Sequence, residues 1–140
     1  MKKRSATAVW NGGLKDGMGH ISTEAGALNN VPYNFSMRFE DQKGTNPEEL
    51  IAAAHAACFS MFLSMVLGDA GMKGEINTKA TVTLEQVGSG FDVTSSALET
   101  TVKVPQADQA KFQAAAEAAK TGCPISKLLK AKITMNAQLI

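Results

Sequence analysis

The longest run of apolar positions lies between residues 45 and 71 and predicts one long helix. No residue from Leu50 to Leu67 carries a formal charge, and the polar interruptions there are His55, Cys58, Ser60 and Ser64. Asn46 stands before Pro47, and Glu49 follows three residues after Asn46. That order is typical of a capped helix N-terminus, with proline at the first helical position.

A helix that is apolar on all sides is either the buried axis of a fold or a membrane span. Alanine makes up much of this run, and Glu48, Glu49 and Asp69 flank it where a membrane anchor would more often show Lys or Arg. We therefore expect a buried central helix and no membrane as partner.

Shorter alternating segments on both sides of the helix predict strands. Residues 3–11, 18–23 and 33–39 are expected to form a three-stranded antiparallel sheet. After the helix we expect strands at 75–87, 91–104 and 132–140, the last as an edge or closing strand. Gly88, Ser89 and Gly90 predict a hairpin turn, and a change of phase predicts a bulge near Ser95 and Ser96.

Two further helices complete the predicted elements. Residues 108–121 are rich in alanine and end at Gly122, and Cys123 followed by Pro124 predicts the start of a short helix. The expected fold class is α+β, with antiparallel sheets wrapped around a long central helix. A length of 140 residues predicts a single domain over residues 1–140.

Composition and charge narrow the function. The 14 basic and 13 acidic residues give a net charge of +1, so no basic field recruits nucleic acid. The N-terminus lacks the apolar core of a secretory signal, which predicts a cytoplasmic protein. Two cysteines in a reducing compartment are seldom a permanent disulfide. His20 and His55 do not stand at ligand spacing from a cysteine, so neither a metal nor a cofactor is expected.

The two cysteines are the first candidates for chemistry. Cys58 lies at the centre of the apolar helix, where a thiol is inert unless a nearby cation holds it as thiolate, and Arg38 could supply that charge. Cys123 begins a helix, where unpaired N–H groups favour an anion. Such a pair suits a division of labour, in which one thiolate is oxidised to a sulfenic acid and the other condenses with it. A buried, unreactive Cys58 is the alternative.

Three separated motifs resemble the OsmC/Ohr family of organic hydroperoxide reductases, and its osmotically inducible OsmC branch in particular. They are the run from Arg38 to Leu50, RFEDQKGTNPEEL, the run from His55 to Met61, HAACFSM, and the run from Gly122 to Ser126, GCPIS. The match covers essentially the whole chain in the order of its elements.

The resemblance implies a thiol-dependent peroxidase that reduces alkyl or lipid hydroperoxides in antioxidant and stress defence. Cys58 then matches the peroxidatic cysteine and Cys123 the resolving one, with an external dithiol as reductant. Arg38 matches the active-site arginine and Glu49 the glutamate that holds it. The resemblance also implies an intertwined homodimer with active sites at the interface. Glu49 precedes Cys58 by nine residues, which puts it ~13 Å away along the helix, so only a second chain could bring it there.

Four apolar side chains, Phe35, Phe39, Met61 and Phe62, are candidates for the lining of a substrate pocket. Two rival hypotheses stay open. One is a non-enzymatic dimer that binds an apolar ligand or senses oxidants. The other is an acyl-transfer hydrolase with Cys58 as nucleophile and His55 as base, although a hydrogen-bonded core histidine is the simpler interpretation of His55.

Overall fold

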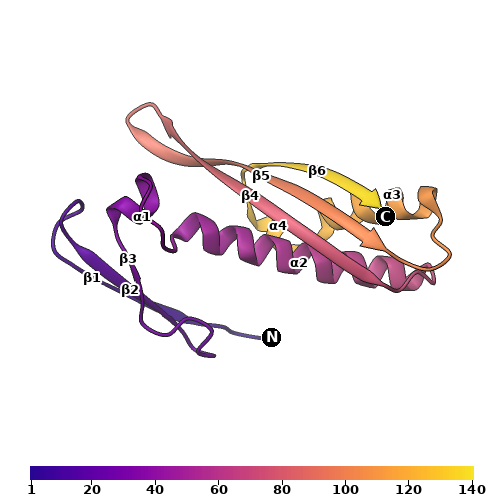
Figure 1. Cartoon of the computed structure of the whole chain (residues 1–140), viewed down its shortest axis with the longest axis horizontal. Coiled ribbons are helices and arrows are strands. Elements are labelled where there is room, and N and C mark those ends of the chain that lie inside the picture. The colour runs from indigo at the N-terminus through magenta and orange to yellow at the C-terminus, as the bar shows by residue number, and fades with distance from the viewer. The chain divides into compact units, whose positions relative to one another are not determined.

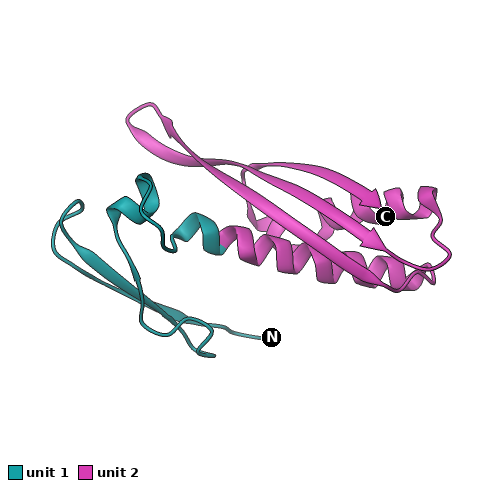
Figure 2. Ribbon diagram, in the orientation of Figure 1, with its two compact units in different colours: residues 1–50 teal, residues 51–140 magenta.

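The computed structural model describes all 140 residues, and the chain divides into two compact units (Figure 2). Residues 1–50 form the first unit and residues 51–140 the second. The boundary falls within the long helix α2 (Pro47–Asp69), so the helix begins in one unit and continues in the other (Figure 1). The single domain over residues 1–140 stays a prediction.

The first unit contains the predicted three-stranded antiparallel sheet. Its strands are β1 (Ala6–Asn11), β2 (Met18–Thr23) and β3 (Val31–Tyr33), in that order. Gly19 of β2 lies between Trp10 and Tyr33, whose ring centroids are 5.4 Å apart. A Cβ atom at Gly19 would lie 2.4 Å from Cε1 of Tyr33, so this close approach of the two rings requires glycine.

Helix α1 (Phe35–Phe39) corrects the predicted strand over residues 33–39, which ends instead at Tyr33. The side-chain oxygen of Asn34 accepts a hydrogen bond from the backbone N–H of Met37 at 2.9 Å and caps the helix. Apolar and polar residues alternate here, but the local cap offers the backbone a helical turn instead. The turn puts Phe35 and Phe39 side by side, with ring centroids 4.9 Å apart.

Helix α2 confirms the central prediction. The side-chain oxygen of Asn46 accepts a hydrogen bond from the backbone N–H of Glu49 at 2.8 Å, as expected of an N-cap residue. A row of side chains four residues apart is buried, namely His55, Phe59, Leu63 and Leu67. On the opposite side Met61 is 77% exposed and Met65 is 53% exposed.

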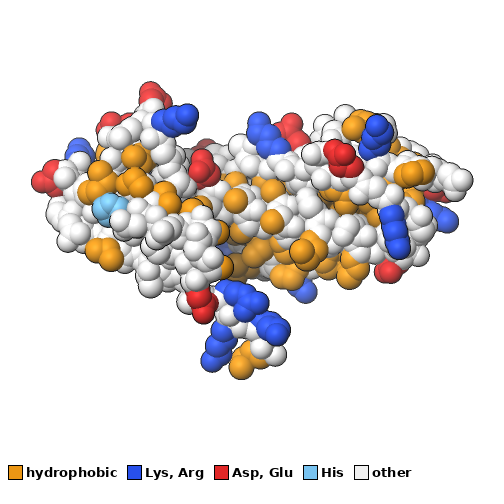
Figure 3. All heavy atoms as spheres, turned by 60° about the horizontal axis from the view of Figure 1, so that its bottom comes forward, with side chains coloured by type: hydrophobic (Ala, Val, Ile, Leu, Met, Phe, Trp, Pro, Cys, Tyr) orange, Lys and Arg blue, Asp and Glu red, His pale blue; other side chains and the backbone are white.

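The burial of α2 differs from the sequence-based expectation. By length and hydropathy α2 is the one helix of the chain that could cross a membrane, and 22% of its most apolar 18-residue window is buried. Helix α2 is therefore buried on one face only, whereas the sequence predicted burial on all sides. Figure 3 shows hydrophobic side chains gathered on the face of the second unit that is turned toward the viewer, with few charges among them.

A three-stranded sheet covers α2 in the second unit. Strands β4 (Glu75–Val87) and β5 (Gly90–Lys103) are antiparallel and joined by the predicted turn. The pairing register between β4 and β5 shifts at Thr94 of β5, next to the bulge predicted near Ser95 and Ser96. Strand β6 (Lys132–Leu139) pairs with β5 in parallel, which corrects the expectation of antiparallel sheets only. The reason is the helical connection between β5 and β6, since parallel neighbours require a long crossover.

That connection carries helices α3 (Gln109–Gly122) and α4 (Pro124–Leu128). Cys123 is both the C-cap residue of α3 and the N-cap residue of α4, so its position is fixed by two helices. The core of the second unit consists of fully buried side chains from α2, β5, α3 and this junction: Phe59, Leu63, Leu67, Leu98, Val102, Phe112, Ala116, Ala119 and Cys123.

Candidate functional site

The second unit brings its two cysteines together, and both are free thiols. Cys58 is partly exposed on α2, whereas Cys123 is completely buried where α3 meets α4. The Cys123 side chain and the backbone of Ile125 both lie within hydrogen-bonding reach of Cys58. A partly exposed thiol therefore stands next to a sealed one, and only the first is open to a molecule from solvent.

Burial raises the pKa of the Cys58 thiol, and the neighbouring Cys123 raises it further. A hydrogen bond from the backbone of Ile125 acts in the opposite direction and lowers the same pKa. In the second unit alone, Cys58 is thus held as the neutral thiol. A reactive thiolate at this position needs a cation from elsewhere.

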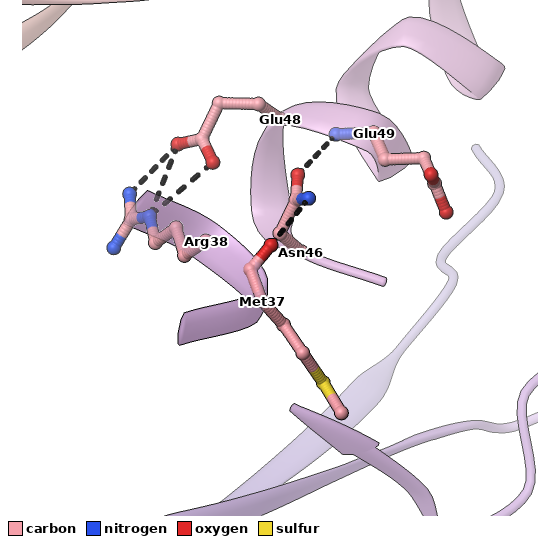
Figure 4. A network of polar contacts seen from close by, with 5 residues as sticks. All are labelled: Met37, Arg38, Asn46, Glu48 and Glu49. Carbon is pink, nitrogen blue, oxygen red and sulfur yellow. Dashed lines mark hydrogen bonds and ion pairs between the residues drawn. The ribbon is translucent and has the colours of Figure 1, made fainter. Parts of the chain in front are cut away.

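The first unit supplies an oriented arginine. Arg38 of α1 pairs with Glu48 in the first turn of α2, with 2.8 Å between Nη2 and Oε1 (Figure 4). Its Nε atom contacts both carboxylate oxygens, at 3.3 Å and 3.2 Å. Glu48 is only 8% exposed, so its carboxylate is largely committed to the guanidinium. The Arg38 guanidinium also lies over the ring of Phe39, 5.1 Å from its centroid.

Within the chain, the partner of Arg38 is Glu48 and not the expected Glu49. The carboxylate of Glu49 accepts a hydrogen bond from Thr45 at 3.0 Å and points away from Arg38 in Figure 4. The sequence showed two adjacent glutamates but not which of them faces α1. A role for Glu49 across an interface between two chains stays a prediction.

The four predicted pocket residues line two separate hollows. In the first unit, Phe35 and Phe39 line a hollow of about 290 Å³ together with Arg38, Trp10, Leu14, Tyr33 and Asn34. In the second unit, Met61 and Phe62 line one of about 280 Å³ together with Cys58, Met65 and Pro124. Each hollow thus combines an apolar wall with one of the candidate groups, the guanidinium in one and the thiol in the other.

A buried histidine adjoins the thiol pair, and sequence reasoning gave it no firm role. His55 is completely buried on α2, and its two ring nitrogens contact the hydroxyl groups of Ser96 and Ser126. Burial lowers the pKa of His55. Neither ring nitrogen contacts Cys58, which argues against His55 as the direct base of a cysteine hydrolase. Ser126 could have been found from its place three residues after Cys123, but Ser96 had no such signal.

The chain offers no cluster of three or more His, Cys, Asp or Glu side chains that could hold a metal ion. The fold and the paired thiols define the class instead: an α+β protein with one cysteine on a long central helix and a second where two shorter helices meet. A family model described as "OsmC-like protein" matches residues 40–138. The chain therefore belongs to the OsmC-like protein family, as the sequence motifs predicted.

Three known proteins show how close the similarity is. The chain is 52% identical to "Peroxiredoxin OsmC" of Escherichia coli (strain K12) over 137 residues, covering 97% of this chain and 96% of that protein. The crystal structure of the "Organic Hydroperoxide Resistance Protein OhrB" of Bacillus subtilis is 27% identical and superposes with a TM-score of 0.67, covering 97% of this chain and 98% of that one. An OsmC-like protein from Vibrio cholerae shares the fold at 14% identity, with a TM-score of 0.78.

Proposed function

We propose that this protein is a two-cysteine thiol peroxidase that reduces organic hydroperoxides to alcohols. The observation that carries the proposal is the partly exposed Cys58 thiol in contact with the sealed Cys123 thiol. The relatives named as a peroxiredoxin and as organic hydroperoxide resistance proteins support the same activity.

The difference in exposure between the two thiols supports a separate step for each. The Cys58 thiolate attacks the O–O bond of the hydroperoxide, takes one oxygen as sulfenic acid and releases the alkoxide, which is protonated to the alcohol. Cys123 then attacks the sulfur of Cys58, water leaves, and a disulfide forms. An external dithiol reduces the disulfide. The hollow beside Cys58, lined by Met61, Phe62 and Met65, suits the apolar part of an alkyl or lipid hydroperoxide.

Arg38 is the proposed source of the positive charge that Cys58 requires. Each pKa unit by which a cation favours the thiolate corresponds to ~1.4 kcal/mol. A partly desolvated guanidinium can supply this amount. Glu48 orients the guanidinium through a bidentate ion pair. The Phe35 and Phe39 side chains beside Arg38 would add a second apolar wall to the substrate pocket.

A second copy of the chain completes the proposed site. Glu48 precedes Cys58 by ten residues in one helix, which separates their Cα atoms by ~15 Å along the axis. The Arg38 that Glu48 holds is therefore assigned to the Cys58 of a partner subunit. The exposed apolar side of α2, with Met61 and Met65, supports a homodimer, because monomers seldom leave such a surface in water.

Multiple turnover tests this function. With excess dithiothreitol, the protein should consume many equivalents of cumene hydroperoxide and consume hydrogen peroxide more slowly. An oxidant sensor or ligand-binding dimer would stop after one equivalent. An acyl-transfer hydrolase would leave the peroxide intact and keep its activity in Cys123→Ser, whereas the peroxidase loses its cycle or is overoxidised in that variant. Consumption of no more than one equivalent would refute the proposal.

A further inference from the structure

A continuous chain of polar contacts leads from the interior of the second unit to the buried cysteine. It begins at Ser96 of β5, whose hydroxyl oxygen lies 2.7 Å from Nδ1 of His55. Nε2 of His55 lies 2.8 Å from the hydroxyl oxygen of Ser126, which lies 3.2 Å from the sulfur of Cys123. The backbone N–H of Ser126 donates to the same sulfur at 3.3 Å. The chain thus ends on a reacting atom of the proposed function.

The resolving step needs a proton acceptor, because a thiol must lose its proton before it attacks. Cys123 is completely buried, so bulk water does not reach its S–H group directly. The only hydroxyl group that contacts its sulfur is that of Ser126. Apart from Cys58, with which Cys123 reacts, the polar route open to the proton of Cys123 runs through Ser126 toward His55.

We propose that His55 is a positioning residue that takes the proton of Cys123 through Ser126 while the disulfide forms. This inference rests on the proposed function. In the step, the S–H proton of Cys123 passes to the oxygen of Ser126, and the hydroxyl proton of Ser126 passes to Nε2 of His55. The freed Cys123 thiolate attacks the sulfur of Cys58 and breaks its S–O bond. The leaving hydroxide takes up a proton from solvent, to which Cys58 is partly exposed, and departs as water. When the external dithiol reduces the disulfide, Cys123 leaves as thiolate and takes its proton back from His55 through Ser126, which returns His55 to its neutral form.

The partners of His55 suit a proton carrier better than a fixed core residue. Hydroxyl groups can donate or accept, so Ser96 and Ser126 can satisfy the imidazole in either protonation state. The relay requires the neutral tautomer in which Nδ1–H donates to Ser96 and Nε2 accepts from Ser126. In the imidazolium, both N–H groups donate, and the Ser126 hydroxyl turns toward the thiolate. Burial lowers the pKa of His55, so the resting ring is neutral and able to accept a proton.

A single-turnover experiment separates the two chemical steps. Reduced protein is mixed with one equivalent of cumene hydroperoxide and quenched with acid at set times, and the mass of the intact protein is measured by mass spectrometry. Oxidation of Cys58 adds one oxygen, and disulfide formation then leaves the protein two hydrogens lighter than at the start. The variants are His55→Gln and Ser126→Ala. Ser60→Ala is the matched control, because it removes a hydroxyl on α2 that bonds to Thr78 and not to either cysteine.

We expect His55→Gln and Ser126→Ala to acquire oxygen at the wild-type rate and to form the disulfide at least ~100-fold more slowly, the usual loss when a general base is removed. Ser126→Thr, which keeps the hydroxyl, should recover most of the rate. Ser60→Ala should match the wild type in both steps.

Disulfide formation within threefold of wild type in Ser126→Ala would overturn the relay, whether or not His55→Gln folds. Equal slowing of both steps would also overturn it, since that indicates a general structural effect. Failure of the wild type to acquire oxygen would instead refute the proposed function itself.

Discussion

Replacing Glu48 by glutamine tests whether the carboxylate observed against Arg38 is the one that matters. Glutamine keeps the shape of the side chain but removes its charge, and it turns an NH₂ group or a neutral oxygen toward the guanidinium. The contacts at stake are those of Nη2 at 2.8 Å and of Nε at 3.2 Å and 3.3 Å. Because Glu48 is 8% exposed, little water is available to replace the carboxylate.

The size of the effect follows from these contacts. Hydrogen bonds to charged groups contribute about 1.5–3 kcal/mol. The Arg38 side chain is 37% exposed, so water compensates in part, and the lower half of that range applies. A loss of about 1.5–2 kcal/mol in the orientation of Arg38 corresponds to a ~10–30-fold slower reaction.

Stopped-flow measurement of the second-order rate constant for Cys58 oxidation by cumene hydroperoxide gives the number directly. Glu49→Gln is the competing variant, because the sequence assigned Arg38 to Glu49, whose exposed carboxylate accepts a hydrogen bond from Thr45 instead. If the ion pair with Glu48 orients Arg38, we expect Glu49→Gln to stay within about twofold of wild type, as surface substitutions usually do. A loss of tenfold or more in Glu49→Gln, with Glu48→Gln unchanged, would refute the reasoning from the ion pair.

Three further predictions follow from burial and packing. Met65→Asp should raise the dimer dissociation constant, measured by sedimentation equilibrium, at least ~100-fold, because it puts a charge on the exposed apolar side of α2 in each copy. Val87→Asp, at the exposed hairpin, is the control and should leave this constant unchanged. Gly19→Ala should lower the free energy of unfolding in urea by about 1–3 kcal/mol, because its Cβ would overlap two aromatic rings, whereas Gly90→Ala has open space and should lose none. Because burial lowers the pKa of His55, His55 binds a proton near pH 6.5 in the unfolded chain but stays neutral at that pH in the folded chain. Wild type should therefore lose stability relative to His55→Gln as the pH falls from about 7.5 to 5.5, by up to ~1.4 kcal/mol per pH unit. Equal slopes in the two proteins would contradict this.

The fold was predictable wherever a local signal determined it. The cap at Asn46 marked the start of α2, and the alternation over residues 75–87 and 91–104 marked β4 and β5. The alternation over residues 33–39 was misleading, because the side chain of Asn34 caps a helical turn there. The parallel pairing of β6 could not be read from its own alternation, since the length and path of α3 and α4 decide the strand direction.

The candidate site was predictable in its residue types but not in its pairings. Two unlike cysteines and an arginine among apolar neighbours were visible in the sequence. The choice between Glu48 and Glu49 depends on where α1 lies against the first turn of α2, a tertiary contact without a sequence signature. The same holds for Ser96, which joins His55 only because β5 packs over α2.

The most direct test of the two-thiol mechanism is the intact mass of the reduced protein after one equivalent of cumene hydroperoxide. The mechanism predicts a loss of two hydrogens in wild type and the gain of one oxygen in Cys123→Ser. An unchanged mass in both proteins, or a gain of oxygen in Cys58→Ser at the wild-type rate, would contradict it.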